Sequence, residues 1–357
     1  MLEMPGEYRA RLPLPFEVGE TEGGTDQIQV ALEGSVPIVC YVWEGESELG
    51  VTVMRTADLL FESLSQELGE IGHRSLTAID AGALGGAPFH AASWLFTADA
   101  SSLGLLKIAA ANKQGRGMAC NHWDAGYRQT FERVFSDLVE SFQVAEPPPV
   151  PYYAEIFVMR MNDLPVGVEQ LEFSMDAEGD TRVKHHSSTL IPTSQSELVS
   201  TYSVSVEWSR PDGALINSYS SETGVDGTHT ELMLRRNEIR GWHVTGKLQD
   251  KELDADVEHE GSIDTSLGES IALRERLVPL GDETVVRQLR WVPEVDPTGV
   301  LDVSLEGVAG DPPGLRLRFG PIEMTAVRDP LGMARSGTVR AGRIEMALER
   351  VYQDGGF

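Results

Sequence analysis

The stretch MACNHWDAGYRQTFERVFSDLVESF, Met118–Phe142, contains a predicted strand followed by a predicted helix. Apolar and aromatic side chains recur along its second part at spacings of three and four residues: Tyr127, Phe131, Val134, Phe135, Leu138 and Phe142. This spacing predicts a helix with one apolar face, which must pack on a sheet. Asp124 directly precedes the pattern and is the expected N-cap, because its carboxylate can accept hydrogen bonds from the free amides of a first helical turn.

Cys120, His122 and Asp124 lie within five residues of one another, which raises the question of a catalytic cluster. A thiol nucleophile needs a base within hydrogen-bond distance. On a strand, side chains two residues apart are separated by roughly 6–7 Å, which is too far for direct contact. We therefore interpret the stretch as a strand-to-helix junction with a buried thiol. A hydrolase that uses Cys120 and His122 is kept as an alternative hypothesis.

The region before this stretch has a mixed α/β pattern. Residues Val36–Trp43 are β-branched, aromatic and almost continuously apolar, as expected for a buried strand. The segment Gly50–Gly72 predicts a strand and then a helix, with Thr56 as N-cap and Gly69 or Gly72 at the helix end. Further strands separated by glycine-rich turns are predicted between this helix and the opening stretch.

The segment VAEPPPVPYY, Val144–Tyr153, separates two regions of different pattern, because its prolines favour a stiff, extended linker. After it, strands with alternating polar and apolar residues dominate, as in Thr201–Ser209. We predict an α/β domain at residues 1–145, a Pro-rich linker at 146–152 and an all-β domain at 153–357. The predicted fold class is α+β: an α/β/α sandwich whose antiparallel sheet is flanked by helices, followed by a mostly antiparallel β-domain built as a large curved sheet, half-barrel or sandwich.

Residues 8–144 resemble the PsbP/DcrB-like α/β/α sandwich superfamily. The resemblance rests on the turn GGAPF (Gly85–Phe89), the aromatic strand around Trp94 and a terminal helix that ends in Ser141-Phe142. Members are photosystem extrinsic subunits, small GTPase-binding proteins and chaperones of type VI secretion effectors, so the resemblance implies a binding protein and no enzymatic activity. The C-terminal half resembles the β-meander of periplasmic lipoprotein carriers through its opening strand, the turn NDLPVG (Asn162–Gly167) and a returning strand.

Charge and cysteine content narrow the possible partners and compartments. The chain has 357 residues and a formal net charge of −27, which argues against general binding of nucleic acids or anionic membranes. It has two cysteines, Cys40 and Cys120, too few for a disulfide scaffold, so we expect buried thiols and a reducing compartment. A cytoplasmic location is expected, since neither a signal peptide nor a membrane-spanning segment is visible.

The histidines do not have the spacing of a metal site. Adjacent residues on a strand point to opposite faces, so His185 and His186 cannot both join one site. The remaining candidates are His229, Glu231, His243 and His259. No zinc, calcium, Walker or dinucleotide motif is present. We therefore predict no catalytic, cofactor-binding or metal-binding residues and no cofactor.

Three function hypotheses remain. The first is a non-enzymatic cytoplasmic chaperone or adaptor that buries an apolar segment of a protein partner, for example a secretion-system effector. The second is a carrier of a lipid or another apolar small molecule in a cavity of the β-domain, and the third is the hydrolase. Two sets of apolar residues are interpreted as either core or binding surface: Val39, Tyr41, Trp43 and Trp94 in the first domain, and Phe157, Met159, Met161 and Met175 in the second.

Overall fold

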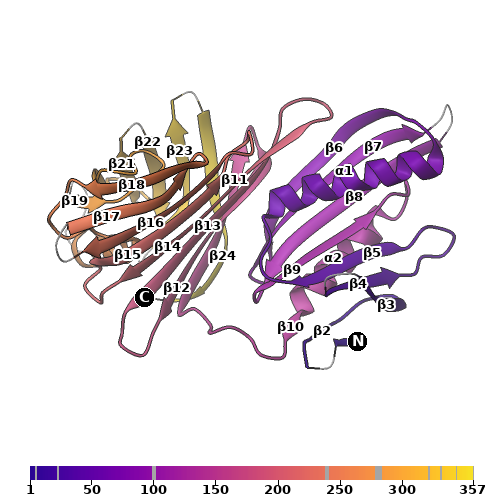
Figure 1. Ribbon diagram of the computed structural model, residues 1–357, viewed down its shortest axis with the longest axis horizontal. Coiled ribbons are helices and arrows are strands. Elements are labelled where there is room, and N and C mark those ends of the chain that lie inside the picture. The colour runs from indigo at the N-terminus through magenta and orange to yellow at the C-terminus, as the bar shows by residue number, and fades with distance from the viewer. Residues whose placement is uncertain are drawn as a thin grey trace. The chain divides into compact units, whose positions relative to one another are not determined.

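The computed structural model describes residues 1–4, 6–21, 24–98, 102–237, 241–277, 284–320, 322–329, 332–342 and 344–356 (Figure 1). It is mostly antiparallel β-structure with large open sheets. The chain forms two compact units. Unit 1 comprises Met1–Val150, Leu164–Val168 and Ser188–Tyr202, and unit 2 comprises Pro151–Asp163, Glu169–Ser187 and Ser203–Phe357.

Unit 1 contains a seven-stranded sheet in the order β3-β4-β5-β9-β8-β7-β6. Its strands are β3 (Phe16–Thr21), β4 (Thr25–Val30), β5 (Ile38–Glu44), β6 (Ile71–Leu84), β7 (Ala87–Ala98), β8 (Ser102–Lys113) and β9 (Arg116–His122). A three-stranded sheet accompanies it, formed by β1 (Leu2–Met4), β2 (Tyr8–Ala10) and β10 (Gln143–Val144). The helices are α1 (Leu49–Leu68) and α2 (Arg128–Ser141). Strand β6 is therefore an edge strand, and β5 and β9 lie side by side in the middle of the large sheet.

The two helices pack on opposite faces of the seven-stranded sheet. Phe61 of α1 contacts Trp94 and Phe96 of β7, with ring centroids 6.3 and 5.7 Å apart. Phe135 of α2 contacts Phe89 of the same strand at 6.2 Å. Alternate residues of a strand point to opposite faces, so the even-numbered aromatics of β7 face α1 and Phe89 faces α2. Trp94 is consequently a core residue, with 4% of its surface exposed.

Trp43 packs over a glycine of the neighbouring strand. A Cβ atom on Gly117 would lie 2.3 Å from the Trp43 ring, so only glycine leaves room for the indole there. Val39, Tyr41 and Trp43 are all half-buried. Their side chains therefore pack against the sheet rather than stand free of it.

The sequence-based boundaries of α1 were wrong at its start and correct at its end. The helix begins at Leu49 with Glu48 as N-cap, so Thr56 lies inside it and no strand precedes it there. The β-branched Val51–Val53 suggested a strand, but Leu49, Val53 and Ala57 already follow the helical spacing of the buried face. Gly69 is the C-cap with φ 91°, a conformation that glycine adopts without strain.

Unit 2 contributes to one 14-stranded sheet in the order β18-β17-β16-β15-β14-β13-β12-β11-β24-β23-β22-β21-β20-β19 (Figure 1). Its strands are β11 (Tyr153–Met161), β12 (Leu164–Met175), β13 (Thr181–Pro192), β14 (Leu198–Ser209), β15 (Leu215–Thr223), β16 (His229–Asn237), β17 (Gly241–Leu248), β18 (Lys251–Val257), β19 (Val285–Arg290), β20 (Leu301–Val308), β21 (Gly314–Phe319), β22 (Ile322–Arg328), β23 (Ala334–Ala341) and β24 (Ile344–Gly355). Helix α3 (Ser266–Ala272) and the π-helical turn η1 (Leu273–Leu277) follow β18. The predicted antiparallel β-region is thus one large sheet.

Helix α3 fills part of one face of this sheet. Leu267 belongs to a buried cluster with Tyr153 and Phe173, and Ala272 to one with Val286 and Leu305, so the helix bridges strands from both halves of the sheet. A cation fixes its first turn: the Nη2 atom of Arg290 donates to Glu207 Oε1 (3.1 Å) and to Ser266 Oγ (3.0 Å), and Nη1 donates to Glu269 Oε2 (3.0 Å).

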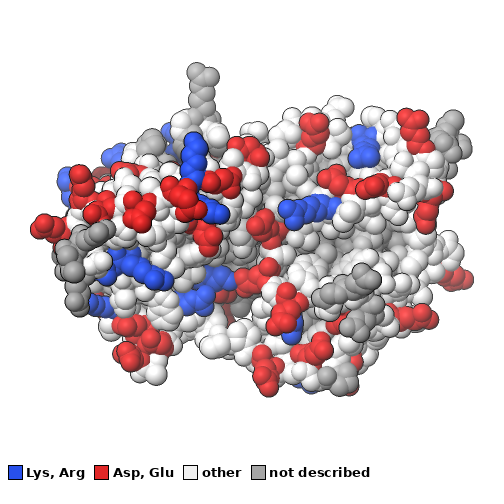
Figure 2. Space-filling view, in the orientation of Figure 1, with Lys and Arg blue, Asp and Glu red and all other residues white. Residues whose placement is uncertain are grey.

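The four apolar residues considered for a groove at the start of unit 2 do not form one surface. Phe157 and Met159 are buried, Met161 is half-buried and Met175 is exposed. Acidic side chains are distributed over the visible surface of each unit, as expected from the net charge (Figure 2).

Candidate groove in unit 1

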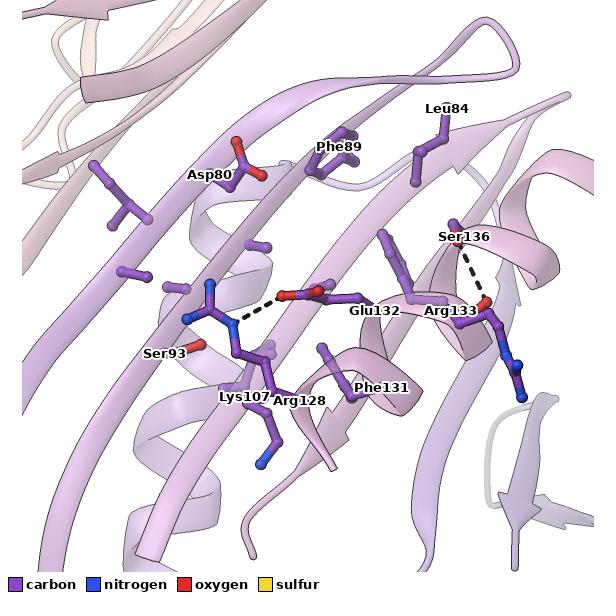
Figure 3. Close-up of a pocket in the computed structure, with 17 residues that line it drawn as sticks. Asp80, Leu84, Phe89, Ser93, Lys107, Arg128, Phe131, Glu132, Arg133 and Ser136 are labelled. Carbon is purple, nitrogen blue, oxygen red and sulfur yellow. Dashed lines mark hydrogen bonds and ion pairs between the residues drawn. The ribbon is translucent and has the colours of Figure 1, made fainter. Parts of the chain in front are cut away.

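A cavity of about 400 Å³ lies on the α2 side of the seven-stranded sheet (Figure 3). The open part of the sheet forms its floor, which consists of small side chains: Ala78 on β6, Ala91 and Ser93 on β7, and Ala109 on β8. Helix α2 forms one wall with Phe131 and Phe135. The cavity exists because small residues on the sheet meet only one short helix, which covers β8 and β9 but leaves β6 and β7 partly uncovered. We call this cavity the α2 groove.

The sheet register divides the α2 groove into two ends. At one end Phe89 lies beside Leu84 and Phe135, and the lining is mostly apolar, with Asp80 and Ser136 also near this end (Figure 3). At the other end Ser93 pairs with Lys107 on β8, and Arg128, the first residue of α2, overhangs the floor (Figure 3). The groove therefore has an apolar end and a basic end.

Lys107 is a structural cation at the basic end. Its side chain is 1% exposed, and its ammonium donates to three backbone carbonyls, those of Leu105, Asp124 and Gly126. Burial lowers the pKa of Lys107 to about 8, and Asp124 opposes that shift. Three carbonyl acceptors match the three donors of an ammonium. The side chain thus joins β8 to the turn before α2, and it points away from the groove (Figure 3).

The junction between β9 and α2 differs from the prediction. The N-cap of α2 is Tyr127, with φ 59° and no side-chain cap, so the assignment of Asp124 as N-cap was wrong. Asp124 instead accepts a hydrogen bond from Ser35 Oγ at 2.6 Å, which lowers the pKa of its carboxyl. Nothing local in the sequence indicates this contact, because Ser35 precedes Asp124 by 89 positions. The rest of the predicted apolar face is buried, except for Tyr127, which is exposed. The buried residues are Phe131, Val134, Phe135 and Leu138 on α2 and its C-cap Phe142.

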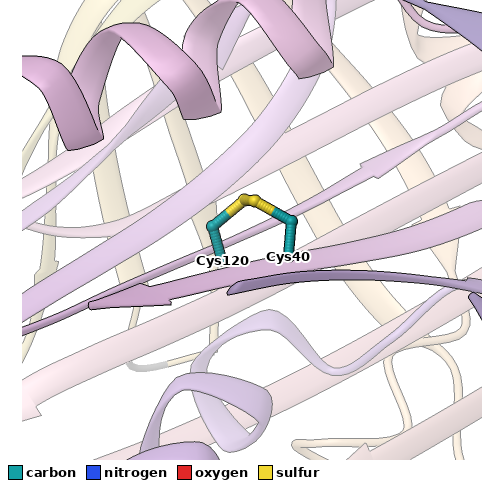
Figure 4. Close-up of a disulfide and its surroundings, with 2 residues drawn as sticks. All are labelled: Cys40 and Cys120. Atoms are coloured by element: carbon teal, nitrogen blue, oxygen red, sulfur yellow. A yellow bond between two sulfur atoms is a disulfide. The ribbon is translucent and has the colours of Figure 1, made fainter. Parts of the chain in front are cut away.

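Cys40 and Cys120 form a disulfide beneath α2, so the expectation of free thiols was wrong (Figure 4). Both residues are completely buried, as predicted, but they lie directly opposite each other on β5 and β9. Their pairing follows from strands that are far apart in the sequence and adjacent in the sheet. A disulfide sulfur has no thiolate form, so Cys120 in this state cannot be the nucleophile of the hydrolase hypothesis.

His122 is buried at the end of β9, two residues after Cys120. Its imidazole remains neutral at neutral pH. Burial, followed by the nearby Lys107 ammonium, lowers its pKa to about 4, although Asp124 acts in the opposite direction. Its Nε2 atom lies 3.3 Å from Ser35 Oγ. Ser35 donates its proton to Asp124 and not to the imidazole, so the three side chains do not form a catalytic triad, in which the histidine lies between the other two.

We expect His122 to make unit 1 less stable as the pH falls from 6.5 to 4. The pKa in the folded state is below the ordinary value of 6.5, so the unfolded chain binds a proton in this window that the folded chain does not bind. The full effect below pH 4 is at most roughly 3 kcal/mol. Urea unfolding of His122→Gln and wild type at pH 7 and pH 4.5 measures it. The variant should lose less stability on acidification than wild type, and equal losses would contradict the assignment.

Two of the histidines considered as metal ligands, His185 and His243, contact carboxylates. His185 Nε2 lies 2.7 Å from Glu169 Oε1; burial acts to lower the pKa of His185, but Glu169 raises it overall. His243 contacts Asp256 at 2.7 Å and Asp254 at 3.0 Å. Within the described ranges, no three or more His, Cys, Asp or Glu side chains are grouped so that they could hold a metal ion.

None of the helices in the described ranges has both the length and the apolar composition required to cross a bilayer.

No family model matches the sequence, and no curated protein matches it. Among solved structures, a β-barrel-like protein with a domain of unknown function, DUF1849, from Brucella abortus is 12% identical, with a TM-score of 0.43 over 57% of this chain and 98% of that one. The cyanobacterial PsbP (CyanoP) from Synechocystis sp. PCC 6803 is 11% identical, with a TM-score of 0.28 over 40% of this chain and 89% of that one. The resemblance to PsbP is therefore only weakly reflected in the structure, and at these scores neither protein indicates what this chain does.

Proposed function

We propose that this chain is a non-enzymatic binding protein, a chaperone or adaptor, that shields an apolar segment of a protein partner in the α2 groove. Unit 1 would then be a PsbP/DcrB-like α/β/α sandwich that presents the groove. The observation that carries the proposal is the cavity between the phenylalanines of α2 and the small side chains of β6, β7 and β8. Mostly apolar concavities of a few hundred Å³ are the usual form of a binding site.

The position of β6 favours a chain segment as the occupant. Because β6 is the edge strand, the groove is bordered on one side by exposed residues such as Thr77 and Asp80. Strand addition to this edge is disfavoured: β6 has two irregularities in register, and the amide of Leu76 already donates to the carbonyl of Gln195. The occupant would therefore insert side chains into the groove.

The acidic surface supports the same proposal. A net charge of −27 keeps copies of the chain apart, which matters for a protein that presents an apolar groove. The free thiols on which the expected reducing compartment depended are replaced by a disulfide. Because disulfides persist mainly in oxidising environments, we propose an oxidising compartment as the place of action.

Filling the groove should weaken the binding of an apolar segment. Ala91→Trp places an indole on the floor, and we expect the affinity for a fluorescein-labelled peptide of leucine and alanine to fall at least about tenfold, as it would on losing 1.4 kcal/mol. Ala347→Trp, at an exposed alanine of β24, is the matched control and should bind the peptide like wild type. Fluorescence anisotropy measures both. Equal binding by wild type and Ala91→Trp would remove the groove from the proposal.

A second candidate function is a carrier of an apolar small molecule, because about 400 Å³ also suits a ligand of that size. The expected place for such a ligand was the β-domain, where α3 and η1 pack on the sheet. Native mass spectrometry of gently purified protein distinguishes the two candidates. A co-purified lipid would support the carrier; its loss in Ala91→Trp would place it in the α2 groove, and its retention would favour the β-domain. Protein that carries no lipid would count against the carrier.

A further inference from the structure

We infer that the partner segment carries an acidic group at one end of its apolar residues, and that this group lies at Arg128. The inference rests on the proposed function, because it names the chemistry and the direction of the occupant of the same groove. Its basis is the difference between the two ends of the α2 groove. Phe89, Leu84 and Phe135 offer apolar contacts at one end, whereas the guanidinium of Arg128 lies at the other.

Arg128 is placed to receive an anion. Its guanidinium lies over the small side chains of the floor, on the groove side of α2 (Figure 3). The Nε atom of Arg128 donates to Glu132 Oε1 at 2.9 Å. Among the described residues, neither Nη atom of Arg128 has a hydrogen-bond partner. A guanidinium presents a planar set of donors that matches a carboxylate. The Arg128–Glu132 pair thus leaves the carboxylate-binding edge of the arginine available.

The start of α2 adds to the positive potential at the same place. Arg128 is the first residue of this 14-residue helix, the N-cap Tyr127 provides no side-chain hydrogen bond, and the first turn contains no acidic residue. The free amides and the helix dipole therefore act together with Arg128. The Lys107 ammonium lies beneath the same end, held by backbone carbonyls.

Two acidic residues, Glu132 and Asp80, line the groove. Glu132 is the single carboxylate paired with Arg128 among the described residues. Asp80 stands on β6 in the row of Ala91, and its carboxylate accepts from the amide of Ala81 at 2.9 Å. A segment that enters with its acidic end at Arg128 places its apolar residues on the floor and against Phe131 and Phe135.

The test uses the full chain and two labelled peptides that share one leucine–alanine core, one ending in glutamate and the other in lysine. Wild type should bind the glutamate peptide about fivefold more tightly, the preference expected of a partly exposed ion pair. Arg128→Glu should reverse the preference. Arg133→Glu is the matched control, since it makes the same charge change on the same helix at a side chain that points away from the groove (Figure 3).

The outcomes separate this inference from the proposed function. If both peptides bind equally and Ala91→Trp weakens both, the groove binds apolar segments but the acidic end is wrong. A preference that Arg133→Glu reverses as fully as Arg128→Glu would also overturn the inference, because it would reflect overall charge. If neither peptide binds while laurate does, the occupant is a small molecule and both proposals fail.

Discussion

Replacing both Cys40 and Cys120 with alanine is expected to lower the free energy of unfolding of unit 1 by roughly 4 kcal/mol. The disulfide closes a loop with a sequence separation of 80, and a long closed loop strongly restricts the unfolded chain. It also joins β5 to β9, the two central strands that support α2. Urea unfolding monitored by circular dichroism measures the loss.

Reduced wild-type protein is the matched control for this variant. It keeps both sulfur atoms in the core and lacks only the cross-link, so the loss of stability that it shares with the double variant is the contribution of the disulfide. Both sulfur positions are completely buried, so reduction under native conditions should be slow and should accelerate in urea. If reduced and oxidised protein unfold at the same urea concentration, the disulfide does not stabilise the fold.

Arg290→Met is expected to destabilise unit 2 by roughly 3–5 kcal/mol. The side chains of Arg290, Glu207 and Glu269 are only 14%, 12% and 24% exposed, so removal of the arginine leaves two enclosed carboxylates without their cation. Helix α3 also loses the bond to Ser266 that fixes its first turn. Hydrogen exchange of the Ser266–Ala272 segment should increase more than that of unit 1.

Two comparisons make the result specific. Arg340→Met breaks the Arg340–Glu345 pair, whose side chains are 63% and 57% exposed, and should cost much less stability than Arg290→Met because solvent screens an exposed pair. The deficit of Arg290→Met should shrink on acidification. Burial already raises the pKa of Glu269, and the loss of Arg290 raises it further, so protonation of this carboxyl at acidic pH relieves a penalty that persists at alkaline pH. Equal costs for the two arginines would contradict a buried role for Arg290.

Local sequence patterns were sufficient for most elements but not for their contacts. The apolar spacing from Phe131 to Phe142 predicted α2 and its buried face, because a helix repeats every 3.6 residues. The start of α1 was missed because Val51–Val53 suit both a strand and a helix, and only packing decided between them. The cap of α2 was missed because Asp124 bonds to Ser35, a distant residue.

The sequence by itself determined that the chain is acidic, is rich in antiparallel strands and contains a proline-rich segment near residue 150. Composition and the local alternation of polar and apolar residues are sufficient for these three properties. Only the tertiary structure decided that Cys40 meets Cys120 and that small residues of β6, β7 and β8 leave a groove beside Phe131 and Phe135. Both features depend on the order of strands in the sheet. That order results from the packing of segments far apart along the chain, which no local pattern records.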